Sequence, residues 1–297
     1  MPELPEVEIT ARLLDRALRG AEIESALAPG INALKTFEPP LSALEGRRIA
    51  AVRRRGKHLI LDADGGLSLL MHLMSAGRLQ LYDKRAGPRD RTSRLLLRIG
   101  AGAEAPSQDA GSDAPSHERE LRLREFGSKQ AAWVKLMDTD QLEHDDSLAT
   151  LGPETWPEPP PFGELLAAPR PLHTVLRDQR VIAGIGRSWV DEILWHARLS
   201  PYKRGADLDA AEAEVLRTAT IDTLGGAIEH YERLLNLPIP DKLPMPLLVH
   251  RHEGEPCPRC ATTLRAVHFE DYIIAYCPTC QTEGRVLKDR RMSRLLR

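Results

Sequence analysis

The chain has 297 residues, of which 42% are hydrophobic and 28% charged, and its formal net charge is -2. This length and composition favour a globular protein of two domains that can bury a sizeable core. No apolar run approaches the ~18 residues of a membrane span. The first residues are acidic where a secretory signal would be basic, so we expect a cytoplasmic protein.

The first half of the chain predicts one helix followed by short strands. A helix is expected over 5–18, because Pro and Glu occupy its first turn and Gly20 fits its end. The strands are segments rich in Leu, Ile or Val and punctuated by Gly or Asp: 47–53, 58–62, 67–73, 78–82, 94–99, 121–124 and 131–136. Residues 1–150 are therefore expected to form an antiparallel β-sandwich with a flanking helix. The stretch 101–120, rich in Ala, Gly, Pro and Ser, is expected to be a flexible connection between two strands.

The second half predicts a helical domain and a small cysteine module. Five prolines in 151-LGPETWPEPPP-161 favour an extended linker, which places the domain boundary there. Helical patterns follow at 163–168, 172–177, 187–198 and 208–235, and a Pro-rich loop is expected at 237–248. We therefore expect a helical domain over 151–248, a cysteine module over 249–284 and a basic tail over 285–297. The predicted fold class is α+β.

The four cysteines form two Cys-x-x-Cys pairs. Cys257 and Cys260 are separated by sixteen residues from Cys277 and Cys280. Two such pairs close a tetrahedral site, which predicts a zinc ribbon with one structural Zn²⁺ ion. Four thiolate ligands leave no open position for catalysis. Unligated cysteines or a redox pair are the alternative.

The N-terminus carries a candidate nucleophile. Pro2 is small enough to permit removal of Met1, which would leave a free secondary amine. Such an amine attacks an electrophilic sugar carbon and forms an iminium, an electron sink that turns base excision into strand cleavage by elimination. A carboxylic acid at Glu3 can protonate the sugar ring oxygen as the bond to the base breaks. The same segment also fits an ordinary helix N-terminus whose acids complement the dipole.

Several segments resemble, in the same order, the formamidopyrimidine-DNA glycosylase and endonuclease VIII family. They are 1-MPELPEVEITARL-13, 54-RRGKHLIL-61, 71-MHLMSAGRL-79, 124-REFG-127, 151-LGPE-154, 181-VIAGIGRSWVDEILWHA-197 and 253-EGEPCPRC-260 with 277-CPTC-280. The resemblance implies a bifunctional DNA glycosylase and AP lyase of base excision repair. It implies a monomer that binds damaged double-stranded DNA, and no membrane, in a cleft between a β-sandwich and a helix–two-turn–helix domain ending in the ribbon.

The resemblance also implies the catalytic residues. Pro2 corresponds to the nucleophile, Glu3 to the acid and Glu6 to a second active-site carboxylate. Lys57 corresponds to a hairpin lysine that contacts phosphate beside the lesion. By itself Lys57 fits a solvated lysine of an arginine-rich strand equally well.

One group of DNA-binding residues surrounds a glycine turn. Gly186 and Arg187 resemble the turn of the family's helix–two-turn–helix element, where backbone N–H groups and a side chain hold phosphate at a helix N-terminus. Arg187 stands where the family has asparagine. Glu192 on the following helix is expected to support this turn. A simple turn between helices is the alternative.

A second group concerns the base stack. An enzyme that flips a nucleotide must fill the vacated space. Phe126, beside the DNA-binding Arg124, resembles that wedge, and a buried strand phenylalanine is the alternative. Met74 and Ser75 compete for a second wedge position. The finger arginine of the family falls at or near Tyr272, so the basic tail is expected to take over some of its charge.

Two departures from the formamidopyrimidine branch favour endonuclease VIII-like lesions, such as oxidised pyrimidines and abasic sites. Glu125 replaces an arginine and is expected near the opposing strand. The Pro-rich segment 237–248 replaces a longer loop that closes over a flipped oxidised purine. One alternative is that neither feature touches DNA and that the enzyme is an 8-oxoguanine/formamidopyrimidine glycosylase. Others are a non-catalytic lesion- or DNA-binding protein on the same scaffold, or a zinc-ribbon interaction module.

Overall fold

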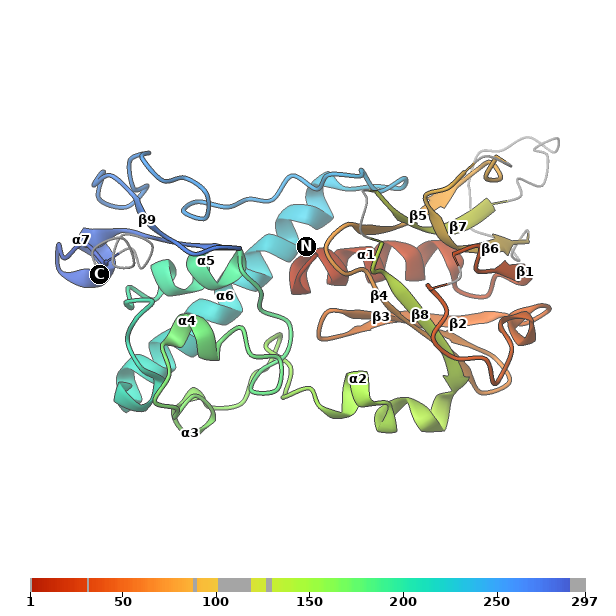
Figure 1. Cartoon of the computed structure of the whole chain (residues 1–297), viewed down its shortest axis with the longest axis horizontal. Coiled ribbons are helices and arrows are strands. Elements are labelled where there is room, and N and C mark those ends of the chain that lie inside the picture. Colours follow the sequence, from red (N-terminus) through yellow and green to blue (C-terminus); the bar gives the residue numbers. More distant parts are fainter. Residues whose placement is uncertain (1, 31, 88–89, 101–118, 127–129, 289–297) are drawn as a thin grey trace. The chain divides into compact units, whose positions relative to one another are not determined.

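A computed structural model of the chain describes residues 2–30, 32–87, 90–100, 119–126 and 130–288. It contains two compact units, Met1–Ala149 with Tyr231–Leu243, and Thr150–His230 with Pro244–Arg297 (Figure 1). The predicted domain 151–248 differs from this division, because 231–243 belong to the N-terminal unit. The reason is packing: Tyr231, Leu235 and Ile239 share a small core with Ile9 and Leu13.

The N-terminal unit begins with the helix α1 (Leu4–Leu18), as predicted. Pro5 lies in its first turn, where the missing N–H costs no hydrogen bond. The buried residues Val7, Ala11, Leu14 and Leu18 recur at helical spacing and join the core of the unit. This packing fixes the helix that carries the N-terminal motif.

Two four-stranded antiparallel sheets complete this unit. The first has the order β1 (Ile23–Leu27), β6 (Ser93–Ile99), β7 (Arg119–Glu125), β5 (Gly77–Tyr82). The second has the order β2 (Ile49–Arg55), β3 (His58–Ala63), β4 (Leu67–His72), β8 (Trp133–Asp138). One hydrophobic core contains residues of both sheets and of α1, so the predicted sandwich with a flanking helix is confirmed.

The sequence did not predict strand β1. Only Ile23 of its five residues is buried, so the segment lacks the alternation of apolar residues by which a strand is recognised. The predicted loop 101–120 is shorter than expected, because Arg119 and Glu120 belong to β7. Its other residues lie outside those that the structure describes. Three short helices lie between other elements of the unit: η1 (Leu41–Leu44), η2 (Thr139–His144) and α2 (Asp146–Ala149).

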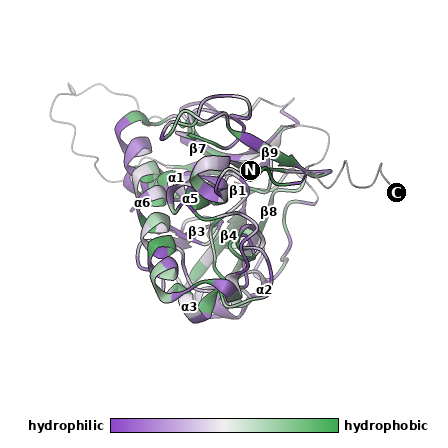
Figure 2. Cartoon of the chain, turned by 90° about the vertical axis from the view of Figure 1, so that its left-hand side faces the viewer, coloured by the Kyte–Doolittle hydropathy of each residue, from purple (hydrophilic) through white to green (hydrophobic). Residues whose placement is uncertain are grey.

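The C-terminal unit is mainly helical, as expected. Its helices are α3 (Phe162–Leu165), α4 (Leu172–Val175), α5 (Trp189–His196), η3 (Gly205–Asp207) and α6 (Ala210–Leu234). In α6 the buried residues recur every three or four positions, among them Leu216, Leu224 and Ile228. Figure 2 accordingly shows both hydrophobic and hydrophilic residues along this helix.

The unit ends in a small ribbon. Strands β9 (Arg265–His268) and β10 (Ile273–Tyr276) pair antiparallel, and the helix α7 (Pro278–Thr282) follows. The segment 237–248 forms neither helix nor strand, as its prolines predicted. Residues 289–297 of the predicted basic tail lie outside the described part of the chain.

Candidate active site

The N-terminal motif forms the start of α1. Glu3 is the N-cap residue, and Glu3 and Glu6 form a reciprocal capping box in which each side chain accepts from the other's backbone N–H. The Glu6 Oε2 lies 2.9 Å from the Glu3 nitrogen. Both carboxylates are buried, Glu3 with 1% and Glu6 with 3% of their surface exposed. The box therefore holds two acids in fixed positions directly after the half-buried Pro2.

The second oxygen of Glu6 binds a tyrosine. Tyr231 donates its hydroxyl to the Glu6 Oε1 at 2.8 Å, from the last turn of α6. Burial and the negative charge of Glu6 raise the pKa of Tyr231, which keeps the hydroxyl protonated as a donor. Tyr231 is a residue that the sequence analysis missed, since it lies 225 residues from Glu6 within an ordinary helical pattern.

Lys57 lies in the tight turn between β2 and β3, where Arg55 pairs with His58. Gly56 has a positive φ of 57°, which a glycine adopts without strain. Lys57 has only 8% of its surface exposed, so it is not the solvated lysine of the alternative interpretation. Burial and the positive charge of Lys57 lower the pKa of His72 to about 4.

His72 connects Lys57 to the predicted wedge turn. Its Nδ1 accepts a 3.0 Å hydrogen bond from the backbone N–H of Met74, which places the proton of the neutral ring on Nε2. Met74 has a positive φ of 50° and is half-buried, and Ser75 is exposed. The two candidates thus lie side by side in the turn between β4 and β5. His72 lies in the segment 71–79 that resembles the family, but the sequence predicted no role for it.

Phe126, the other candidate for a wedge, directly follows the neighbouring strand β7. Because Gly77 pairs with Glu125, the turn before β5 and the end of β7 are adjacent. Phe126 has 39% of its surface exposed, unlike a buried strand phenylalanine. The Arg124 guanidinium lies 4.6 Å from the Phe126 ring centroid. The sheet therefore brings Arg124 and Phe126 to the same edge as Met74 and Ser75.

The position of Glu125 differs from the one that the sequence predicted. It was expected near the opposing DNA strand, but it has only 1% of its surface exposed. Its Oε2 accepts from the Ala132 N–H at 2.9 Å and lies 3.9 Å from the Arg94 Nε. Successive strand residues point to opposite faces, so the neighbours Arg124 and Phe126 face outward while Glu125 faces the interior. Glu125 therefore carries no information on substrate choice.

In the C-terminal unit, a glutamine holds the glycine turn. Gly184 has a positive φ of 114° and Gly186 is buried. Gln179 Nε2 donates to the Ile185 carbonyl at 2.8 Å, and its Oε1 accepts from the Gly184 N–H at 3.0 Å. Arg187, next in the chain, is exposed. Gln179 therefore has the supporting role that we expected of Glu192.

Glu192 holds a different segment. Its carboxylate accepts from the N–H groups of Leu248, Val249 and His250 at 2.8–3.0 Å. Burial raises its pKa, although these three hydrogen bonds act in the opposite direction. Glu192 thus fixes the entry of the chain into the cysteine module rather than the glycine turn.

The four cysteines converge as predicted. The Sγ atoms of Cys257, Cys260, Cys277 and Cys280 all lie within 4.8 Å of one another, and the Cys257–Cys280 and Cys260–Cys280 pairs are 4.0 and 3.5 Å apart. A tetrahedral site with metal–sulfur bonds of about 2.3 Å requires sulfur–sulfur separations of roughly 3.8 Å. The cluster fits such an ion. Trp195 donates its indole N–H to Cys257 Sγ at 3.3 Å. Such a hydrogen bond would orient this sulfur atom toward a bound ion.

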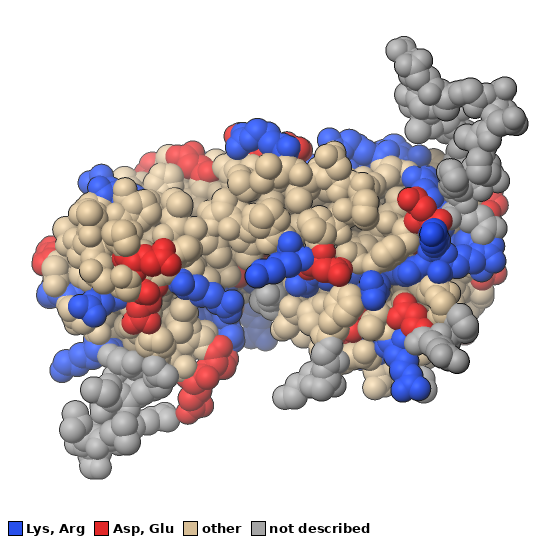
Figure 3. All heavy atoms as spheres, turned by 90° about the horizontal axis from the view of Figure 1, so that it is seen from above, with Lys and Arg blue, Asp and Glu red and all other residues tan. Residues whose placement is uncertain are grey.

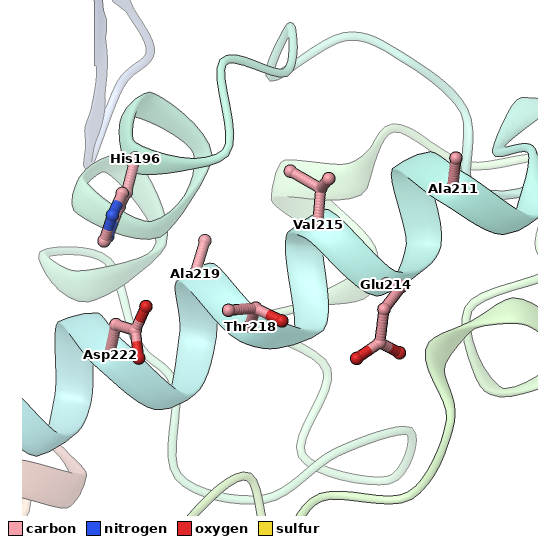
Figure 4. Close-up of a pocket in the computed structure, with 7 residues that line it drawn as sticks. All are labelled: His196, Ala211, Glu214, Val215, Thr218, Ala219 and Asp222. Carbon is pink, nitrogen blue, oxygen red and sulfur yellow. The ribbon is translucent and has the colours of Figure 1, made fainter.

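A cavity of about 480 Å³ lies elsewhere in the C-terminal unit. Figure 4 shows its lining, with His196 from the end of α5 and the other side chains from α6. None of the predicted site residues lines it. Figure 3 shows Lys and Arg interspersed with Asp and Glu on the face it draws, in keeping with the near-neutral net charge. The predicted site residues therefore lie outside this cavity.

Comparison with known proteins identifies the family. The formamidopyrimidine-DNA glycosylase N-terminal domain matches residues 1–111, and the H2TH domain of the same enzymes matches residues 160–236. Formamidopyrimidine-DNA glycosylase of Streptococcus thermophilus is 30% identical over 293 residues, which cover 95% of this chain and 99% of the relative. The enzyme of Thermus thermophilus is 31% identical over 295 residues, which cover 96% and 100%.

Solved structures agree. A complex of Lactococcus lactis Fpg with DNA containing an abasic site has a TM-score of 0.78 at 25% identity and covers 94% of this chain and 99% of its own. MutM in complex with DNA containing carbocyclic 8-oxo-G has a TM-score of 0.78 at 26% identity and covers 95% and 100%. The chain belongs to the formamidopyrimidine-DNA glycosylase family, which consists of DNA glycosylases with AP lyase activity that act in DNA repair. Among the described residues, no helix has the length and apolar character of a membrane span.

Proposed function

We propose that this protein excises damaged bases from double-stranded DNA and then nicks the strand, with the amine of Pro2 as nucleophile after removal of Met1. The observation that carries the proposal is the buried capping box, which fixes the Glu3 carboxyl group within one residue of that amine. Holding an acid and a nucleophile in fixed positions lowers the activation barrier of a reaction that needs both groups. The N-terminal unit would supply the chemistry, and the C-terminal unit with its ribbon would hold DNA.

The proposed reaction has two stages. Pro2 nitrogen attacks C1′, and the base departs with the electron pair of the glycosidic bond and takes up a proton, in exchange for the proton that the amine loses. Glu3 protonates the ring oxygen, the bond between C1′ and that oxygen breaks, and the electron pair of the nitrogen forms an iminium with C1′. The resulting iminium makes the C2′ proton acidic. Loss of that proton expels the phosphate on C3′, which cuts the strand. Lys57 would neutralise a phosphate beside the lesion, and Phe126 with Met74 or Ser75 would fill the vacated stack.

We propose a structural zinc ion for the cysteine cluster. The spacing of the four sulfur atoms supports this assignment, because thiolates alone select zinc over hard cations such as Mg²⁺. The ion would stabilise the ribbon and take no part in the reaction.

We further propose that the enzyme prefers oxidised pyrimidines and abasic sites to 8-oxoguanine. The support lies in the start of the Pro-rich segment. Gln80 Nε2 donates to the Ile239 carbonyl at 2.8 Å and to Asp241 Oδ1 at 2.7 Å. Arg78 Nε donates to the Asp241 carbonyl at 2.6 Å. Contacts of this kind hold 239–241 against β5 and oppose closure of the segment over a large flipped base.

Borohydride trapping tests the mechanism. Incubation with abasic DNA and borohydride should give a covalent adduct that maps to the Pro2 nitrogen, and the active protein should lack Met1. An active enzyme with an intact Met1, or an adduct on another residue, would contradict the proposed nucleophile. A protein that binds lesion DNA without any adduct would instead be the non-catalytic lesion-binding alternative.

A further inference from the structure

The turn between β9 and β10 carries two stacked aromatic rings. Phe269 and Tyr272 lie with their ring centroids 4.5 Å apart and an interplanar angle of 4°. The Phe269 N–H donates to the Tyr272 carbonyl at 2.8 Å, which closes the turn. This is the place where the family resemblance led us to expect an arginine. The stacked rings of Phe269 and Tyr272 form a flat aromatic surface there instead.

Two guanidinium groups from the glycine-turn region lie against Tyr272. The Cζ of Arg177 is 4.6 Å and the Cζ of Arg187 is 5.4 Å from the Tyr272 ring centroid. Both distances are within the range of a cation–π contact. Arg177 precedes the turn and Arg187 follows it, so one aromatic ring gathers charges from both ends of the same turn.

The support beneath this cluster is buried and polar. His173 has a ring nearly parallel to Tyr272, at 5.9 Å between centroids, and its Nε2 lies 3.3 Å from Asp191 Oδ1. Asp191 Oδ2 accepts from the Ala275 N–H at 3.0 Å and lies 2.7 Å from His250 Nδ1. Asp191 thus ties α5 to β10 and lies beside the His173 ring. A rigid support reduces the entropy lost when the two arginines bind a ligand.

The two arginines differ in their present partners. Arg187 donates to the carbonyl and to the carboxylate of Asp271, at 2.6 and 2.7 Å. This pair is solvent-exposed, with 44% of the Arg187 side chain and 68% of the Asp271 side chain accessible. Exposed pairs contribute little free energy, so a better anion can displace the aspartate. Arg177 lies 3.5 Å from the ring nitrogen Nδ1 of His173. An imidazole ring carries no negative charge, so this contact does not neutralise the Arg177 guanidinium.

We propose that Arg177 and Arg187, held against Tyr272, form a paired-guanidinium site for one phosphate of the DNA backbone. In the absence of DNA, Asp271 pairs with Arg187, and the phosphate displaces it. The site would replace the single finger arginine of the family. Two planar guanidinium forks match the oxygens of one phosphate, which a lone lysine or tyrosine does not. This inference rests on the proposed DNA-binding function and adds Arg177 and Asp271 to it.

Salt-dependent binding tests the site. The full-length, zinc-loaded protein would be titrated with a duplex containing a tetrahydrofuran abasic analogue over a range of salt concentrations. One lost phosphate contact changes the slope of log K against log salt by about 0.9 and weakens binding about eightfold at 0.1 M salt. We expect this change for the double variant R177A/R187A. The matched control is R170A/R204A, which removes two arginines paired with Asp178 and Asp207 in the same unit and should bind as wild type does.

Three single variants test the details of the same site. D271N removes the competing carboxylate and should strengthen binding several-fold at low salt. Y272F keeps the ring and should bind as wild type does, whereas Y272A should approach the double variant. Zinc content and thermal unfolding of each variant establish that the ribbon is intact.

The outcomes separate this inference from the proposed function. Wild-type protein that binds and traps DNA, together with an R177A/R187A variant whose salt slope is unchanged, would overturn the paired site and leave the function standing. A slope change of about 1.8 would indicate two separate phosphates and would also overturn it. Failure of the wild-type protein to bind lesion DNA would overturn the proposed function itself.

Discussion

Tyr231 donates its hydroxyl to the Oε1 of Glu6, at 2.8 Å, and so joins the last turn of α6 to the first turn of α1. The other oxygen of Glu6 accepts from the Glu3 N–H. Through this one carboxylate, Tyr231 fixes the backbone nitrogen of Glu3, which directly follows Pro2. The capping contact is a feature of local sequence, whereas the tyrosine contact depends on how 231–243 pack against α1.

Tyr231→Phe should destabilise this arrangement. It leaves Glu6 Oε1 buried without its donor, which costs about 1–3 kcal/mol of the free energy of unfolding. Denaturant unfolding measures the loss, and the matched variant Tyr276→Phe removes a buried hydroxyl that accepts from Leu287 instead. A double-mutant cycle with Glu6→Gln should give a coupling free energy above about 0.5 kcal/mol. Additive effects would show that the hydrogen bond is not formed in solution.

Glu3→Gln should separate the two stages of the reaction. The amide oxygen of glutamine can still accept from the Glu6 N–H, so the capping box and the stability of α1 should persist. The amide cannot protonate the sugar, so excision of a damaged base should fall by about 100-fold or more. Cleavage of a preformed abasic site should fall much less, because no base has to be expelled. Equal loss of both activities would argue against the role of Glu3 as the acid.

Removal of zinc should unfold the ribbon locally. The core around the ligands consists of Trp195, Val249, Cys257, Leu264 and Cys277, which is too small to be stable without the ion. We expect one zinc per chain by metal analysis and a change in Trp195 fluorescence on chelation or in Cys280→Ser. Lesion-DNA binding should weaken in the same samples. Freshly purified protein without metal would contradict the assignment.

The sequence predicted the fold well where local patterns determine it. The helix at 5–18 and the four cysteines follow from capping residues, helical spacing and ligand spacing. Glu125 shows the limit of such patterns. The motif places it between two proposed DNA-binding residues, yet the pleat of β7 turns it into the interior, and this could be inferred only once the register with β5 was known.

The supporting residues of the candidate site were not predictable for a related reason. Gln179 and Tyr231 act through hydrogen bonds to groups that the fold brings close, and neither residue stands out in its own segment. Glu192 was recognised in a motif, but its three amide donors come from residues 248–250, far along the chain. A single sequence contains no signal for pairings of this kind.

Stability should fall at mildly acidic pH because of two histidines of the N-terminal unit, the buried His58 and the half-buried His72. Burial lowers the pKa of His58 to about 3 and that of His72 to about 4, both below the ordinary 6.5. The unfolded chain therefore binds protons first, so the contribution is complete above pH 6.5 and is lost as the pH falls toward 4 and 3. Between pH 6.5 and 5 the free energy of unfolding should drop by roughly 1.5 kcal/mol for each histidine.

Single variants identify the groups responsible. In denaturant titrations at several pH values, His58→Leu and His72→Leu should each reduce the drop in the free energy of unfolding between pH 6.5 and 5 by roughly 1.5 kcal/mol. His196→Gln, at an exposed position, is the matched control and should retain the wild-type profile. A steep acid loss that persists in both leucine variants would assign it to other groups.

Substrate choice provides the last prediction. On duplexes carrying thymine glycol, dihydrouracil, an abasic site or 8-oxoguanine opposite cytosine, we expect the wild-type protein to process 8-oxoguanine most slowly, because Gln80 holds 239–241 against β5. Gln80→Met keeps the length of the side chain but removes both donors. Loss of two hydrogen bonds should raise the excision rate of 8-oxoguanine relative to thymine glycol by up to about tenfold. Cleavage of the abasic site should be unchanged, since no base then has to be enclosed, and Gln130→Met on the same unit serves as control. If 8-oxoguanine is already the fastest substrate of the wild-type protein, the proposed preference is wrong, although the enzyme class would stand.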